Sequence, residues 1–183
     1  MKDPRPDFSK ALDRLVVDVT RRVPQLGHVR PSEILVVAGA AKDTSRATIR
    51  TLEVPVTVEG HRRRFEVTLR PLFFLDANGL GRLVTLMHEL HHISPAGAGL
   101  AAERRHGAAE GDFDDHVESL ARNYCQVAPM AVLAPLGHHG EVLCRQWRIR
   151  PGATGPARRY SDQHLFLGPV LMQTPRRERT GWW

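Results

Sequence analysis

The chain has 183 residues, which is enough for one domain with a hydrophobic core, while two full domains would be tight. Hydrophobic residues make up 42% of it and charged residues 25%, as in soluble globular proteins, and no apolar run approaches the ~18 residues of a membrane span. A helical membrane protein is therefore excluded, and we expect no membrane partner. The charged, proline-rich N-terminus predicts no signal peptide, and two cysteines without a CxxC pair favour a cytoplasmic protein.

The net charge of +6 is unevenly distributed along the chain. Residues 1–75 hold 14 Lys and Arg against 9 Asp and Glu, and residues 121–183 hold 9 against 3. Residues 76–120 reverse this balance, with 3 against 8. The Arg-rich flanks make nucleic acid a candidate partner, and the alternative is an ordinary solvated surface.

The first periodic segment predicts an amphipathic helix over residues 7–23, where apolar residues recur on one face until Pro24. An apolar, β-branched stretch over 33–38 then predicts a buried strand. Together they indicate that the chain begins with one helix followed by a sheet.

A hairpin is predicted next, from residues 48–58 and 65–69 around a turn at Gly60-His61, with one charged face exposed to solvent. Pro55 indicates an edge strand or a bulge, because proline cannot donate to the ladder. Residues 72–75 are predicted as one more short strand.

The period becomes helical over residues 79–93, and Ser94-Pro95 ends that helix because a residue before proline avoids the α conformation. After a loop at 94–99, a second helix is predicted to begin with Asp112 as its N-cap. Four residues form its apolar face: Phe113, Val117, Leu120 and Tyr124.

Beyond Pro129 the signals weaken, and only 146–150 is predicted as a strand. We therefore predict a single α+β domain over residues 1–150 and a Pro-, Gly- and Arg-rich extension over 151–183 that is partly ordered at best. The domain would consist of an N-terminal helix, a small, mostly antiparallel sheet, and the helix at 79–93 followed by a further helical segment.

The predicted helix at 79–93 contains the motif HExxH as His88-Glu89-Leu90-His91-His92. Residues four apart share one face of a helix, so His88 and His92 can both bind the same Zn²⁺ ion. Glu89 is close enough to act as general base on a water activated by the metal. His91 points to the side of that face, where a structural role is expected. The motif predicts a metallopeptidase that binds one zinc ion per chain and hydrolyses a peptide or protein substrate.

Catalytic zinc normally has a third protein ligand, which must lie elsewhere in the chain. His106 is the favoured candidate, because it follows His92 by fourteen residues and the loop at 94–99 allows the chain to fold back. The alternatives are Glu103, Glu110, His116 and Glu118. The remaining histidines are interpreted as surface residues: His28, His61, His138, His139 and His164.

The stretch Leu86 to Pro95 resembles small metallopeptidases of bacteria and their phages, which are zincins similar in architecture to SprT-like proteases. The likeness continues at Arg104 to Gly107 and at the aromatic-Asp pair Phe113-Asp114, and upstream over 28–36. It implies a zincin-like fold, zinc-dependent peptide hydrolysis, and a third histidine ligand that falls on His106.

Two other functions compete with a peptidase. The first is a zincin-fold module that binds nucleic acid or a partner protein, and Glu89 argues against it because a structural zinc site needs no general base. The second is a di-iron carboxylate protein, since Glu89–His92 and Glu103–His106 both read ExxH. That fold needs glutamates from two further helices, whereas the N-terminal helix has none and residues 33–70 are predicted as strands.

Overall fold

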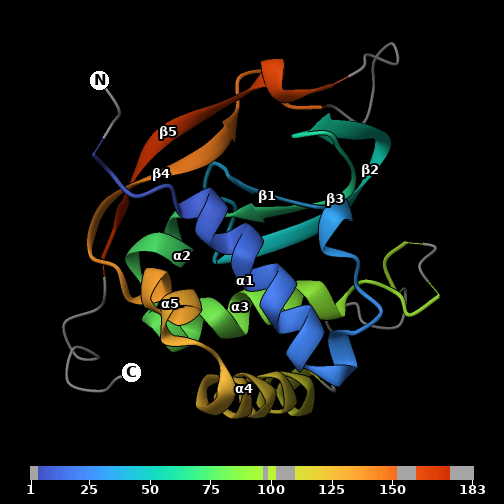
Figure 1. Cartoon of the computed structure of the whole chain (residues 1–183), viewed down its shortest axis with the longest axis vertical. Helices are drawn as coiled ribbons and strands as arrows, with labels where there is room; N and C mark the ends of the chain where they lie inside the picture. Colours follow the sequence, from blue (N-terminus) through green and yellow to red (C-terminus); the bar gives the residue numbers. More distant parts are fainter. Residues whose placement is uncertain (1–3, 97–98, 102–109, 152–159, 174–183) are drawn as a thin grey trace.

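The structure is a computed structural model that describes residues 4–96, 99–101, 110–151 and 160–173. Three layers are visible in Figure 1: a group of helices, a three-stranded sheet, and a two-stranded ribbon on the far side of the sheet. The helices are α1 (Phe8–Arg22), α2 (Pro71–Leu75), α3 (Gly79–His91), α4 (Glu110–Val127) and α5 (Met130–Leu133). The strands are β1 (Ile34–Ala38), β2 (Ala47–Val58), β3 (His61–Leu69), β4 (Gly140–Trp147) and β5 (Leu165–Met172). The predicted α+β class is confirmed.

The N-terminal helix and the first strand form where the sequence predicts them. The side chain of Asp7 accepts a hydrogen bond from the backbone N–H of Lys10, which caps α1 at its first turn. The apolar face of α1 is buried against the sheet, and β1 is buried along almost its whole length. Both predictions depend on local periodicity alone, and both are confirmed.

The three-stranded sheet has the order β1-β3-β2, with β1 parallel and β2 antiparallel to β3. The predicted hairpin is present, but its turn is made by Glu59 and Gly60, both at positive φ, one residue earlier than the predicted Gly60-His61. Between Thr51 and Val56 the register of β2 shifts, and Pro55 lies within that irregular stretch of an edge strand. The prediction that Pro55 marks an edge strand or a bulge is therefore confirmed.

The prediction that one face of this hairpin is exposed to solvent is wrong. Glu66 and Thr68 on β3 are 0% and 2% exposed, because the ribbon formed by β4 and β5 covers that face. Leu35 and Val37 of β1 point to the same side and pack near Trp147 of the ribbon. The sheet is thus buried on both faces, which period-two alternation in one strand cannot reveal.

Three further predictions are corrected by the structure. Residues 72–75 belong to helix α2, because Pro71 starts a helical turn that buries Phe73 and Phe74. Asp112 is not an N-cap, since α4 already begins at Glu110. The strand predicted at 146–150 lies earlier, at β4.

Part of the sequence assigned to the C-terminal extension is an element of the fold. Residues 165–172 form β5, which pairs antiparallel with β4 along the full length of both strands. The backbone N–H of Gln173, just beyond β5, donates to the carbonyl of Phe74 at 2.8 Å and ties this end of the ribbon to α2. Residues 152–159 and 174–183 of the extension lie outside the described residues.

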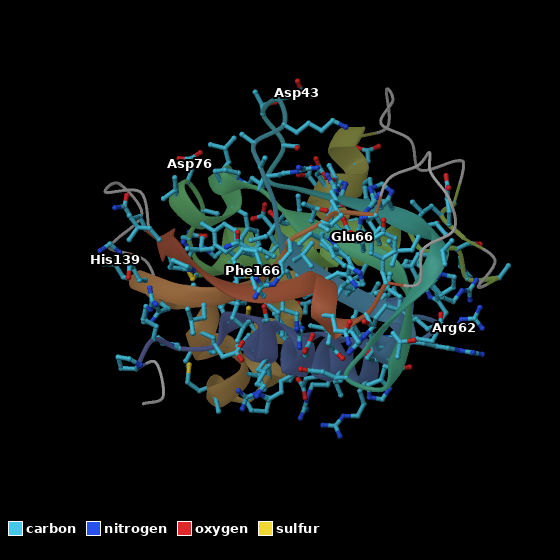
Figure 2. All side chains as sticks on the ribbon, turned by 90° about the horizontal axis from the view of Figure 1, so that it is seen from above. Asp43, Arg62, Glu66, Asp76, His139 and Phe166 are labelled. Atoms are coloured by element: carbon cyan, nitrogen blue, oxygen red, sulfur yellow. The ribbon has the colours of Figure 1, made fainter. Side chains whose placement is uncertain are left out.

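Glu66 joins the sheet to the ribbon through a set of charged hydrogen bonds, and it lies near the middle of the molecule (Figure 2). The guanidinium of Arg50 donates to both carboxylate oxygens at 3.1 and 2.9 Å. Thr68, Trp147 and Arg150 donate at 2.8, 2.8 and 3.0 Å. Burial alone would raise the pKa of Glu66, but the hydrogen bonds and charge of Arg50, with Thr68 and Trp147, hold it below its usual value.

Replacing Glu66 with Gln is expected to lower the free energy of unfolding at pH 7 by about 2 kcal/mol, since it removes the buried anion to which the partly exposed guanidinium groups of Arg50 and Arg150 donate. Because the pKa of Glu66 is depressed in the folded state, its stabilisation is present above the unfolded pKa and is lost as the pH falls. The variant should therefore lose less stability than the parent on acidification. Urea unfolding at several pH values measures both effects.

The matched control is Glu141→Gln, which removes the same charge from an exposed pair with Arg5 on the ribbon. Its effect should stay below about 1 kcal/mol, as for other surface ion pairs. Equal losses of stability in the two variants would contradict the role assigned to Glu66.

Candidate metal centre

Helix α3 carries the HExxH motif and forms where the sequence predicts it. The side chain of Asn78 caps its start by accepting from the backbone N–H of Gly81 at 2.7 Å. An apolar stripe then holds the helix against the core: Leu83, Leu86, Met87 and Leu90, each 0% exposed. The stripe fixes the rotation of the helix, and with it the direction of the motif residues between the apolar positions.

His88 and His92 lie one helical turn apart and bring their rings together. The ring centroids are 4.9 Å apart at an interplanar angle of 67°, and both side chains are half-buried. This is the arrangement that i,i+4 spacing predicts. Two imidazoles so close can both reach one ion between or above them.

Glu89 is buried, at 8% exposure, on the same helix. Its charge acts on the guanidinium of Arg70, which directly follows the central strand β3. Burial lowers the pKa of Arg70, a neighbouring Arg150 lowers it further, and Glu66 and Glu89 oppose the effect. A carboxylate in this setting has a cation nearby and little access to bulk water.

Helix α4 packs beside α3 and contributes two residues to the histidine face. The ring of Phe113 lies 5.0 Å from that of His88 and 6.2 Å from that of His92. Asp114 places Oδ1 2.9 Å from Nδ1 of His88. From the sequence, Phe113 is predicted on the apolar face of a helix, and neither residue is assigned to the site. The feature of the sequence that pointed to them is the aromatic-Asp pair Phe113-Asp114.

Two other histidines contact the backbone in this part of the fold, His91 in the structural role expected of it and His28 against its prediction. His91 is 3% exposed, and its Nδ1 donates to the backbone carbonyl of Met87 at 2.7 Å. His28, interpreted as a surface residue, is instead half-buried, with Nε2 3.0 Å from the carbonyl of Ile93 at the end of α3. Both side chains fix the backbone around the motif.

The candidates for a third ligand are only partly visible. Glu103 and His106 lie outside the described residues, and of Glu110 only the backbone is described. His116 is an exposed residue of α4, and Glu118 pairs with Arg122 on the same helix at 2.6 Å, so neither is directed to the histidine pair. Within the described ranges, no group of three or more His, Cys, Asp and Glu side chains is placed to hold a metal ion. The pair of His88 and His92 is therefore the part of the predicted ligand set that the described structure brings together.

Some of the positive charge in the two flanks is buried inside the fold. Arg63, Arg70 and Arg145 are 5%, 5% and 6% exposed. Arg145 donates to Asp13 at 2.7 Å and to Glu59 at 3.1 Å. The flanks consequently offer less exposed charge to a polyanion than their composition indicates.

Comparison of the chain with protein-family models, with curated proteins and with solved structures gave no match. Among the described helices, none is both long enough and apolar enough to cross a membrane.

Proposed function

We propose that this protein is a zinc-dependent peptidase with a zincin-like fold, in which His88, His92 and His106 hold one zinc ion and Glu89 is the general base. The observation that carries the proposal is the pair of imidazole rings, 4.9 Å apart on one helix, with a buried carboxylate between them in the sequence. Imidazole is a preferred ligand of zinc, and zinc bound by histidines without cysteine is typical of catalytic sites.

The residues fit a catalytic zinc ion in their donor chemistry and accessibility. Both rings are half-buried rather than sealed in the core, so a substrate could reach the ion they bind. Their helix is held by a buried apolar stripe and by α4, which limits the motion of both donors. A third donor from His106 would complete a set of three protein ligands and keep one position open.

Zinc in such a site polarises a substrate carbonyl and lowers the pKa of water to about 7. Glu89 would accept the proton of the attacking water and deliver it to the amine of the departing peptide. The burial of Glu89, at 8% exposure, keeps competing water away from the carboxylate. His91, with Nδ1 committed to Met87, would support the helix rather than the reaction.

The first test is zinc content. The purified protein is expected to hold about one zinc per chain, and His88→Ala, His92→Ala and His106→Ala should each abolish stoichiometric binding, because two imidazoles alone hold zinc weakly. Inductively coupled plasma mass spectrometry after dialysis measures it. The control is His139→Ala, an exposed histidine ahead of β4 that should leave the zinc content unchanged.

Stoichiometric zinc in a protein that lacks both His88 and His92 would rule out this metal centre. If instead His106→Ala retains zinc while Glu103→Ala, Glu110→Ala or His116→Ala loses it, the third ligand is that residue and the HExxH assignment stands.

The di-iron alternative fits the fold less well. Such a site needs four helices that face one another, and residues 34–69 here contribute the three strands β1, β2 and β3. Helix α1 carries no glutamate. The same metal analysis decides the matter, since two irons per chain would replace one zinc.

A further inference from the structure

The orientation of the His88 ring depends on a contact from another helix. Nδ1 of His88 lies 2.9 Å from Oδ1 of Asp114 on α4, a hydrogen-bonding distance. His91, on the same helix, instead satisfies its Nδ1 within α3, at the carbonyl of Met87. Of these two neighbouring histidines, His88 thus takes its Nδ1 partner from outside its own helix.

We propose that Asp114 is a positioning residue that prepares His88 to bind the metal ion. This inference rests on the proposed function. An ionised carboxylate only accepts hydrogen bonds, so the proton of a neutral His88 ring is held on Nδ1. The lone pair that can bind a metal is then on Nε2. A carboxylate in this position also makes the imidazole a stronger ligand and fixes its plane.

Phe113 restrains the same ring from a second direction. Its ring stands edge-on to that of His88, with centroids 5.0 Å apart at 69°. Asp114 therefore limits rotation of the imidazole about its bond to Cβ, and Phe113 limits its tilt. Two adjacent residues of α4 thus restrain both the rotation and the tilt of the His88 ring. The packing of α4 on α3 therefore sets the orientation of this metal ligand.

The position of α4 is itself well determined. Val117 and Ala121 are both 0% exposed in the core that includes α3. One turn later the hydroxyl of Tyr124 donates to Asp18 of α1 at 2.7 Å. These contacts anchor the helix independently of the carboxylate of Asp114, whose side chain is 52% exposed. A substitution of Asp114 should consequently change the His88 ring without unfolding α4.

The test is a zinc titration against a competing chelator, using the full chain. Asp114→Ala is expected to weaken zinc binding about 10- to 100-fold, the usual effect of losing a carboxylate behind a histidine ligand. Asp114→Asn should lose less, because its amide oxygen still accepts from Nδ1. The matched control is Asp115→Ala, which removes the same charge from the next, exposed position of α4 and should bind zinc like the parent.

A second readout does not require metal. ¹⁵N NMR of the metal-free protein should show the His88 ring with its proton on Nδ1, and Asp114→Ala should shift it toward a mixture of both tautomers at unchanged helicity. Parent-like zinc affinity and tautomer in Asp114→Ala would overturn the inference. A loss of zinc as complete as in His88→Ala would also overturn it, because Asp114 would then be a ligand. If the parent binds no zinc, the proposed function fails, and the tautomer measurement still decides the role of Asp114.

Discussion

Glu89→Gln is expected to abolish peptide hydrolysis while zinc stays bound and the fold is retained. Glutamine has the shape of glutamate but cannot take a proton from the attacking water, so the rate should fall at least about 100-fold, the lower end for loss of a general base. Glu89 is 8% exposed, so the isosteric change leaves packing intact. The measurement is cleavage of a fluorescently labelled unfolded protein by zinc-loaded parent and variant.

Glu118→Gln is the control for that experiment. Glu118 lies on α4 and pairs with Arg122 across one turn at 2.6 Å, on the surface of the helix. Its loss should leave hydrolysis at the parental rate. Zinc content and thermal unfolding must be measured for both variants, so that loss of metal or of fold is separated from loss of the base. Parental turnover in zinc-loaded Glu89→Gln would show that Glu89 is not the general base.

The sequence anticipates those parts of the site that are local in the chain. The helical period over α3 and the four-residue spacing of His88 and His92 already determine that their rings meet, because the geometry of one helix brings them together. The contact of Asp114 with His88 depends on how two helices pack. No pattern within either segment contains that information, which is why the carboxylate was not assigned to the site.

The same distinction explains the errors in the fold. The strand pattern of β3 correctly predicts alternation, yet Glu66 is in the core because the ribbon of β4 and β5 covers it. A charged residue in an alternating strand is ordinarily taken as exposed. The burial of Glu66 is tolerable because Arg50, Thr68, Trp147 and Arg150 all donate hydrogen bonds to it. Helix α2 is likewise a tertiary effect, since Phe73 and Phe74 are buried and pack against Phe8 of α1.

Arg82 is expected to be the residue of α3 whose loss costs most in stability. It is 0% exposed, and its guanidinium donates to backbone carbonyls of three separate segments. These are Phe73 at 3.1 Å and Phe74 at 2.8 Å in α2, Leu136 at 2.6 Å, and Gln173 at 2.6 Å after β5. Burial lowers the pKa of Arg82 to about 10, so the cation remains charged at neutral pH and is stabilised by the carbonyl dipoles.

Arg82→Met should therefore lower the free energy of unfolding by more than about 3 kcal/mol, because it leaves several buried carbonyls without a donor. Lysine would keep the charge but not the planar guanidinium group that reaches all four oxygens, so Arg82→Lys should recover only part of the loss.

Arg46→Met is the matched control: Arg46 donates to the carbonyl of Asp76 at 3.0 Å from an exposed position, and its loss should cost less than about 1 kcal/mol. Guanidinium unfolding of the metal-free variants compares them. Arg82 lies six residues before His88 on α3, so its contacts hold the start of the helix that carries both histidines. If Arg82→Met unfolds at the same denaturant concentration as Arg46→Met, the start of α3 is held by its apolar stripe alone.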